Sequence, residues 1–471
     1  MSRFRIAAAG IILSVLFSLP VKAFTGEVIS ITLENSVIYP GTERIVEIYV
    51  PTAYDGVTPA CLLVCMDGGT GIMAEVLDSL IAEGSIPVTI GVIVTPGRIY
   101  DKDERVVRYN RSNEYDRMDG RFAGFIETEV LPRVENLSTA DGRRIRLSGK
   151  AADRAIMGTS SGGICAFNAA WQRPDLFSRV YCFIGTFVSF RGGDQFPALV
   201  RKGEPRRLRV YLQDNMDDTW NPLFGSWFEY NRIMLSALEF AGYEVRHQWN
   251  EGGHDGRNGL ILFPDAMRWL WSGWPEEVPL PKTSNQAIQS LMEPESGWKL
   301  VGEGISPESM LHPYTEEAVL LREGKDSWAV SEDGSRTRIK GKAVGADPYS
   351  AVYPGGSHMA RRVEGSNWVW DYVLDENGQP SFGEEFYFLY ADAGQILYDD
   401  GGYLYAATSV GIQVCDQNGR VRAILSLPGG KVSSIAYAGN NLFAISGGKL
   451  YIRKMKRSGT FSGAPDSEGE G

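Results

Sequence analysis

Short runs of apolar residues alternate with helical patterns from about residue 44 to about residue 271. Continuous apolar runs bounded by turn residues are typical of strands that are buried on both faces. Strands are predicted at 45–50, 61–66, 89–94, 154–157, 180–184, 208–212 and 244–249. Helices are predicted at 122–131, 163–171, 227–240 and 264–271, the last with Pro264 at its first position. This alternation predicts an α/β domain built on a mostly parallel sheet.

The pattern changes after Trp274. Residues 275–297 hold several prolines and little periodicity, which is typical of a linker. From residue 298 to residue 456, short β-type runs are separated by turn signals such as Asn418-Gly419, so this part is predicted to be an all-β domain. The tail, 457–471, has too little apolar content to fold and is predicted to be disordered.

The N-terminus has the pattern of an export signal. Arg3 and Arg5 precede an apolar run that ends at Leu19, and Ala23 completes a small-residue cleavage signal. A membrane anchor is the alternative, but the run is shorter than the roughly 20 residues that span a bilayer. We therefore expect residues 1–23 to be a cleaved signal peptide, the mature domain to begin at residue 24, and the protein to be secreted or periplasmic without a membrane span.

Charge and cysteine content narrow the class of protein. The formal net charge is −11 and no long cluster of Lys and Arg occurs, which argues against nucleic acid or an anionic membrane as a partner. The five cysteines are few and odd in number for an exported chain, so a disulfide framework is not expected. Their spacing suggests no metal site, and we expect all five to be buried as small apolar residues.

The segment Gly158-Thr159-Ser160-Ser161-Gly162 fits G-x-S-x-G, in which a sharp strand-to-helix turn exposes a serine. A Gly/Ser-rich loop without chemistry is the alternative, because such loops are common. A nucleophilic serine needs a histidine base, and an acid lies between them in the chain order of α/β-hydrolases. Of the four histidines, His254 follows the last predicted strand in a glycine-rich loop and is the candidate base.

Acidic residues follow the predicted strand 208–212, where the orienting carboxylate belongs. Position within this loop favours Asp218, and Asp214 is the second candidate. The alternative is that the acidic loop only caps the next helix. Backbone donors for an oxyanion are expected from Ser161, which follows the serine, and from Gly68 or Gly69, which follow the strand 61–66.

These residues resemble the enterochelin-esterase-like branch of the α/β-hydrolases, which includes esterase D-like and feruloyl-esterase-like proteins. The resemblance covers about residues 35–275 and rests on ordered motifs, among them MDGG (66–69), NRSNEYD (110–116), MGTSSGG (157–163), VYLQDNMDD (210–218) and EGGHDG (251–256). It implies an α/β-hydrolase fold, with helices on both faces of the sheet, and a triad of Ser160, Asp218 and His254. Asn215 departs from the family pattern, in which glycine is common.

The same resemblance implies pocket-side roles for Arg111, Glu114 and Tyr115. An internal Arg–Glu ion pair that supports the fold is an equally good interpretation of these residues.

The second domain resembles part of the gluconolactonase/regucalcin-type β-propellers, on segments such as 404–408 and 411–417. Its length allows about four blades at roughly 40 residues each, fewer than the family closes. Where that family shows an Asp-Gly pair the sequence reads Gly394-Gln395, and Glu308 is the one candidate carboxylate. We therefore expect a partial propeller with no metal, which binds a glycan, docks the esterase or mediates self-association.

Together these features predict an exported serine esterase that needs no cofactor. The resemblance implies a carbohydrate, phenolic or siderophore-like ester as substrate. The alternatives are a non-catalytic carbohydrate-binding or scaffold protein with relic domains, and a sugar lactonase that works through the second domain.

Overall fold

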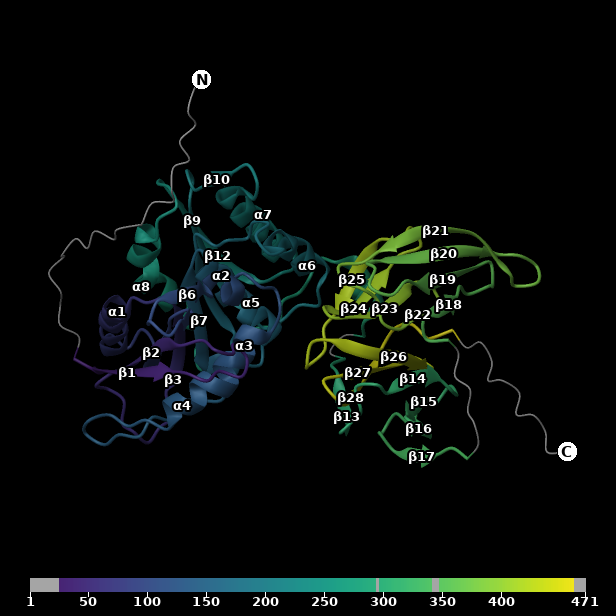
Figure 1. Cartoon of the computed structure of the whole chain (residues 1–471), viewed down its shortest axis with the longest axis horizontal. Coiled ribbons are helices and arrows are strands. Elements are labelled where there is room, and N and C mark those ends of the chain that lie inside the picture. Colours follow the sequence, from purple (N-terminus) through teal and green to yellow (C-terminus); the bar gives the residue numbers. More distant parts are fainter. Residues whose placement is uncertain (1–24, 294–295, 341–346, 461–471) are drawn as a thin grey trace, which may run out of the picture.

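The computed structural model of the chain describes residues 25–293, 296–340 and 347–460. Two domains lie side by side, an α/β domain followed by an all-β domain (Figure 1). The predicted signal peptide, 1–23, lies outside the described residues, as does most of the predicted disordered tail. In the described part of the chain, the helices are all too short or too polar to cross a membrane.

An eight-stranded sheet forms the centre of the first domain, in the order β1-β2-β4-β3-β7-β8-β9-β12. Strands β1, β2 and β4 pair antiparallel, and every pairing from β4 to β12 is parallel. The prediction of a mostly parallel sheet is therefore confirmed. The strands are Glu27–Leu33 (β1), Arg44–Val50 (β2), Cys61–Met66 (β3), Thr89–Val94 (β4), Arg154–Thr159 (β7), Arg179–Phe183 (β8), Arg209–Asn215 (β9) and Glu244–Asn250 (β12).

Helices cover both faces of this sheet. On one face, α1 (Thr70–Ala82) and α8 (Arg257–Trp271) share a hydrophobic cluster with β3 and β8. The other face carries five further helices and a larger cluster. These helices are α3 (Arg121–Phe125), α4 (Leu131–Glu135), α5 (Ser161–Gln172), α6 (Phe196–Lys202) and α7 (Trp227–Phe240), and a π-helical turn, Ile126–Val130, joins α3 to α4.

Helix α8 corrects one prediction. It begins at Arg257, so Pro264 lies inside the helix and not at its first position. A proline removes one backbone hydrogen bond from a helix interior, and here the apolar face continues on both sides of it. Phe263 and Leu270 are buried in the cluster that α8 shares with the sheet.

Four antiparallel four-stranded sheets make up the second domain, which is propeller-like as predicted. Strand β13, the first of the domain, pairs with β28 and completes the last sheet, which ties the two ends of the domain together. The sheets are β14 to β17 (Met310–Pro313, Ala318–Glu323, Asp326–Ser331, Arg336–Arg338), β18 to β21 (Ser350–Val352, His358–Arg362, Trp368–Leu374, Pro380–Phe388), β22 to β25 (Ile396–Tyr398, Leu404–Thr408, Gly411–Cys415, Val421–Leu425), and β13 (Lys299–Glu303) with β26 to β28 (Val432–Ala438, Asn441–Ser446, Lys449–Lys454).

Gln395 joins three of these sheets through its side-chain amide. Its nitrogen donates to the carbonyl of Leu311 at 2.8 Å, and its oxygen accepts from the Ser434 hydroxyl at 2.5 Å and from the Ile435 N–H at 3.1 Å. The residue is 4 % exposed. A buried amide with both ends satisfied is a stable way to hold strand ends together.

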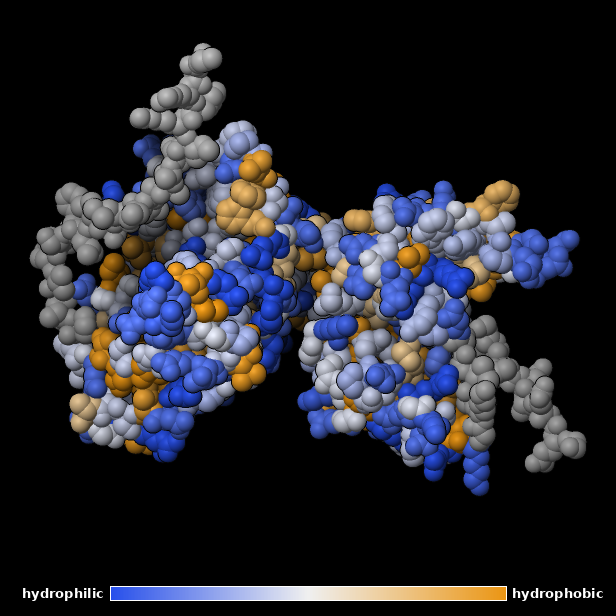
Figure 2. All heavy atoms as spheres, in the orientation of Figure 1, coloured by the Kyte–Doolittle hydropathy of each residue, from blue (hydrophilic) through white to orange (hydrophobic). Residues whose placement is uncertain are grey.

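The domains meet along a narrow band between two lobes (Figure 2). At this boundary the N–H of Glu204 donates to the carbonyl of Ile424 at 2.9 Å, and the carboxylate of Glu204 pairs with Arg453 at 2.7 Å. One hydrophobic cluster includes Leu199 of the first domain and Ile424 of the second. The segment predicted as a linker, 275–297, contains α9 (Gln286–Leu291), whose Ile288 packs with residues of the second domain.

All five cysteines are free and buried, as predicted. Burial raises the pKa of each thiol above its ordinary value. The thiols are therefore protonated, apolar and poorly nucleophilic at neutral pH.

Candidate active site

Ser160 stands at a strained turn between β7 and α5. Its backbone has φ 57° and ψ −121°, a conformation that L residues other than glycine rarely adopt. The turn is so tight that a Cβ on Gly158 would lie 2.3 Å from the carbonyl oxygen of Gly162. Glycine is therefore required by packing at position 158, and the turn holds the Ser160 side chain at the carboxyl edge of the sheet.

Three predicted residues form a continuous hydrogen-bonded chain. The Ser160 hydroxyl oxygen lies 2.9 Å from Nε2 of His254, and Nδ1 of His254 lies 2.7 Å from Oδ1 of Asp218. The His254 side chain is 29 % exposed, whereas that of Asp218 is fully buried. This arrangement lets an imidazole accept the serine proton while a buried carboxylate fixes its tautomer.

The three aspartates of the acidic loop at the end of β9 differ in their exposure to solvent. Asp217 is exposed, and Asp214 and Asp218 are buried and hydrogen-bond to each other. Oδ2 of each buried aspartate has no other donor among the described residues, and a proton held between the two carboxyl groups would satisfy both. Burial, together with the neighbouring Asp218, raises the pKa of Asp214 to about 9. Burial alone would raise the pKa of Asp218 too, but hydrogen bonds from His254 and Asp214 lower it.

Asn215, which departs from the family pattern, supports the histidine loop. Its amide nitrogen donates to the carbonyls of Gly253 at 2.7 Å and Asp255 at 3.1 Å, on either side of His254. Its oxygen accepts from Asn258 at 2.9 Å. A glycine at this position would lack all three bonds, so the departure has a structural purpose in this chain.

Two backbone N–H groups near Ser160 are free to bind an oxyanion. In the described part of the chain, the N–H groups of Gly69 and Ser161 have no acceptor, whereas that of Gly68 donates to the carbonyl of Met66 at 3.0 Å. Gly69 has φ 100° and precedes α1, and Ser161 begins α5. Of the two glycines predicted as alternatives, the structure leaves Gly69 available.

Arg111 holds the loop that carries Gly69. Its guanidinium makes a bidentate pair with Asp67, at 2.7 and 2.8 Å, and a longer bond of 3.4 Å to the carbonyl of Thr159. Glu114 is instead 2 % exposed and forms a buried bidentate pair with Arg44. Tyr115 is fully buried and donates to a backbone carbonyl of β4. Of these three predicted pocket residues, Arg111 is the one next to the site, and Glu114 and Tyr115 lie in the interior.

An aromatic cluster that the sequence did not predict lies beside His254. Trp227 contacts the ring of His254 edge-on, with centroids 5.7 Å apart, and its indole N–H donates to Thr186. The Thr186 hydroxyl lies 3.2 Å from that of Ser160. Phe190 packs against Trp227 and Phe224, and is 38 % exposed. These contacts join distant parts of the chain, so no local sequence motif predicts them.

The positions that the sequence suggested for a metal in the second domain do not form a site. Glu308, the one candidate carboxylate, is exposed, and Gln395 is committed to holding three sheets together. Among the described residues no cluster of three or more His, Cys, Asp or Glu side chains is arranged to hold a metal ion.

One protein-family model matches the chain, and the match lies in the first domain. Residues 38–254 match the model of the Esterase family, described as "Putative esterase", and this span includes all three residues of the hydrogen-bonded chain. No curated protein matches the sequence.

Solved structures are similar to parts of the chain. A ferulic acid esterase matches with 20 % identity over 53 % of this chain and 99 % of its own, with a TM-score of 0.40. The enterobactin esterase of Shigella flexneri matches with 20 % identity over 53 % of this chain and 61 % of its own, with a TM-score of 0.41. A "putative gluconolactonase" matches with 12 % identity over 38 % of this chain and 98 % of its own, with a TM-score of 0.32.

Proposed function

Because residues 38–254 match the model of the Esterase family, we propose that the first domain hydrolyses carboxylic esters through an acyl-enzyme formed on Ser160. The observation that carries the proposal is the chain of hydrogen bonds from Ser160 through His254 to Asp218, at 2.9 and 2.7 Å. These three residues are the proposed nucleophile, base and acid.

The proposed reaction has two steps. The Ser160 oxygen attacks the ester carbonyl while Nε2 of His254 takes its proton, and the N–H groups of Gly69 and Ser161 bind the oxyanion. His254 then gives the proton to the departing alcohol, and the acyl group stays on Ser160. Next, His254 takes a proton from water, the hydroxide attacks the acyl carbonyl, and Ser160 regains its proton as the carboxylic acid leaves. The reaction needs no cofactor.

An aromatic acyl group suits the surroundings of the triad. Phe190, Phe224 and Trp227 form a cluster that contacts His254 and is partly open to solvent. Aromatic side chains bind flat aromatic groups by edge-on and stacked contacts worth about 0.5–1.5 kcal/mol each. A phenolic ester carried by a saccharide or a siderophore-like compound is the proposed substrate class. We also propose export, on the signal pattern of residues 1–23.

Substitution of Ser160 tests the mechanism. Ser160→Ala should remove hydrolysis of p-nitrophenyl acetate by about six orders of magnitude in kcat, with an unchanged circular dichroism spectrum. An aryl fluorophosphonate should add one mass increment to the Ser160 peptide of the wild type and none to the variant. Ser236→Ala, at an exposed serine of α7, is the control and should behave as the wild type. Retention of more than a few per cent of activity by Ser160→Ala would refute the assignment.

A cinnamoyl ester tests the acyl preference. Phe190→Ala should lower kcat/KM for this ester by about tenfold and leave that for an acetyl ester nearly unchanged, because an acetyl group cannot reach the cluster. Equal losses for both esters would mean that Phe190 supports the site without binding the acyl group.

The other two functions from the sequence are less well supported. A non-catalytic scaffold has no use for a strained Ser160 bonded to His254. The position that a lactonase would fill with a carboxylate is Gly394, and the neighbouring Gln395 holds three sheets together.

A further inference from the structure

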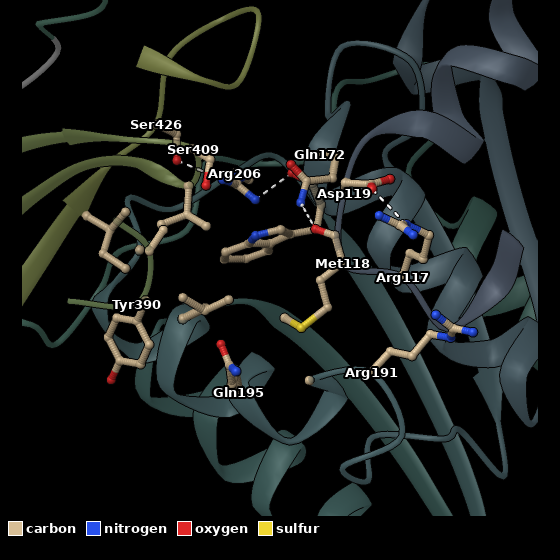
Figure 3. Close-up of a pocket in the computed structure, with 17 residues that line it drawn as sticks. Arg117, Met118, Asp119, Gln172, Arg191, Gln195, Arg206, Tyr390, Ser409 and Ser426 are labelled. Carbon is tan, nitrogen blue, oxygen red and sulfur yellow. Dashed lines mark hydrogen bonds and ion pairs between the residues drawn. The ribbon is translucent and has the colours of Figure 1, made fainter. Parts of the chain in front are cut away.

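A pocket of about 440 Å³ lies at the boundary between the two domains (Figure 3). Its volume falls within the range of small-molecule sites, which is about 300–1,000 Å³. One wall comes from the first domain and includes Arg117, Trp171 and Gln195. The other wall comes from the sheet β22 to β25 and the residues before it, and includes Tyr390 and Ser409. The pocket therefore exists only when the domains are together.

Arg206 brings a positive charge to this pocket without a carboxylate partner among the described residues. Its guanidinium donates to the carbonyl of Trp171 at 2.5 Å and to the hydroxyl of Ser426 at 2.8 Å, and stacks 3.7 Å above the Trp171 ring. The nearest acid along the chain, Glu204, is paired with Arg453. A guanidinium has five N–H donors, so Arg206 can still bind an anion in the pocket.

Arg191 adds a second charge on the opposite side of the pocket (Figure 3). Its one polar contact within the described ranges is a long bond of 3.4 Å to the Ser112 hydroxyl, and the charge of Asp116 acts on it from a distance. The third arginine, Arg117, shares Asp119 with Arg121. Three arginines and one shared aspartate make the pocket positive, although the chain as a whole carries a net charge of −11.

Neutral polar groups and aromatic rings line the space between these charges. In the described part of the chain, the Gln195 amide and the Ser409 hydroxyl have no hydrogen-bond partner, and Figure 3 shows both at the edge of the pocket. Trp171 and Tyr390 supply apolar ring surface. Free amides and hydroxyls match sugar hydroxyls, and guanidinium groups match carboxylates in geometry as well as charge.

We propose that this interdomain pocket binds a saccharide bearing carboxylate groups, with Arg191 and Arg206 on the carboxylates and Gln195 and Ser409 on the hydroxyls. A phosphate ligand alone would leave the neutral groups unused. The choice of a saccharide rests on the proposed esterase function, because the same segment after β8 contacts both sites. The hydroxyl of Thr186, at the start of this segment, lies 3.2 Å from that of Ser160, and Arg191, Gly192 and Gln195 line the pocket. The pocket then holds a remote part of the molecule whose ester is cleaved.

Binding is measured on full-length Ser160→Ala protein by titration calorimetry, so that the result does not depend on turnover. The probes are a short oligogalacturonate, a neutral galactan oligomer of equal length, and inorganic phosphate. Arg191→Gln and Arg206→Gln should each weaken binding of the oligogalacturonate by about tenfold or more, the usual effect of losing a hydrogen bond to a charged group. Arg207→Gln is the matched control, because Arg207 neighbours Arg206 but is exposed and outside the pocket.

Selective binding of the oligogalacturonate that both pocket variants weaken would support the inference. Equal binding of the galactan would show that charge plays no part, and equal binding of phosphate would show an anion site without saccharide recognition, so either result would overturn it. Absence of binding at millimolar concentration would also overturn it. If Arg206→Gln does not fold, Arg191→Gln carries the test. Ester hydrolysis by wild-type protein is scored separately, so that a failure of the pocket and a failure of the proposed esterase remain distinct.

Discussion

Replacement of Asp214 by asparagine tests whether Asp214 and Asp218 share a proton beside the proposed triad. Asp214 accepts the N–H of Asn215 through Oδ1 at 2.7 Å, and its carboxyl group hydrogen-bonds to that of Asp218. Asparagine keeps the acceptor and offers an amide N–H to Asp218 where the acid offers its proton. The variant therefore preserves the hydrogen bonds and removes a titrating group.

The size of the effect follows from the two pKa values. The unfolded chain releases the Asp214 proton near pH 3.8, whereas the folded protein keeps it to about pH 9. Between these values unfolding releases a proton, so the free energy of unfolding of the wild type falls by up to about 1.4 kcal/mol per pH unit. From pH 5 to pH 7 the loss is about 3 kcal/mol. Asparagine has no such loss, so the Tm advantage of Asp214→Asn should grow by roughly 5 to 10 °C over this interval.

Thermal unfolding at pH 5 and pH 7, followed by circular dichroism, measures this difference. Asp217→Asn is the control, because Asp217 is adjacent but exposed, and its Tm difference should stay constant. Hydrolysis of p-nitrophenyl acetate at pH 7 should change by less than about threefold in Asp214→Asn, whereas Asp218→Asn should lose about 10⁴ in kcat. A Tm difference that does not change with pH would refute the shared proton. Loss of activity in Asp214→Asn with retention in Asp218→Asn would make Asp214 the acid.

Three further predictions concern the second domain. Gln395→Leu should lower the free energy of unfolding by about 2–5 kcal/mol, because it leaves three buried polar groups without a hydrogen-bond partner, and it should leave kcat for a small ester unchanged. Chemical denaturation measures the free energy of unfolding, and a loss under 1 kcal/mol would contradict the role of Gln395. EDTA should change neither esterase activity nor Tm, and a tightly held calcium or zinc ion found by elemental analysis would overturn this. A chain ending near residue 280 should keep turnover of a small ester but lose solubility, because Leu199 loses part of its apolar cover; complete loss of turnover in a well-folded fragment would mean that the second domain completes the active site.

The central strands could be predicted because each is a continuous apolar run buried on both faces of a parallel sheet. Strand β1 was missed because it lies at the sheet edge, where most of its residues are partly exposed. Helix α1 was also missed, although Met73, Leu77 and Leu80 have helical spacing and are buried. The turn at Ser160 and the loop at His254 were predictable because chain-local glycine patterns mark them.

Other parts of the site depend on the fold as a whole. Thr186 and Trp227 follow different elements and meet at Ser160 and His254 only because the sheet brings the ends of its strands together. The partner of Glu114 is Arg44, which is 70 residues away. No local spacing indicates such a pair. The pocket between the domains is likewise invisible in either domain alone.

The burial of all five cysteines has a practical consequence. A maleimide reacts with an exposed thiolate, and the native thiols are neither exposed nor ionised at neutral pH. A single cysteine introduced on the surface would thus be labelled selectively, with the native cysteines left in place. Two such positions, one at exposed Ser236 and one at exposed Asp375 of the second domain, would carry a spectroscopic pair across the domain boundary and report in solution whether the two lobes move apart.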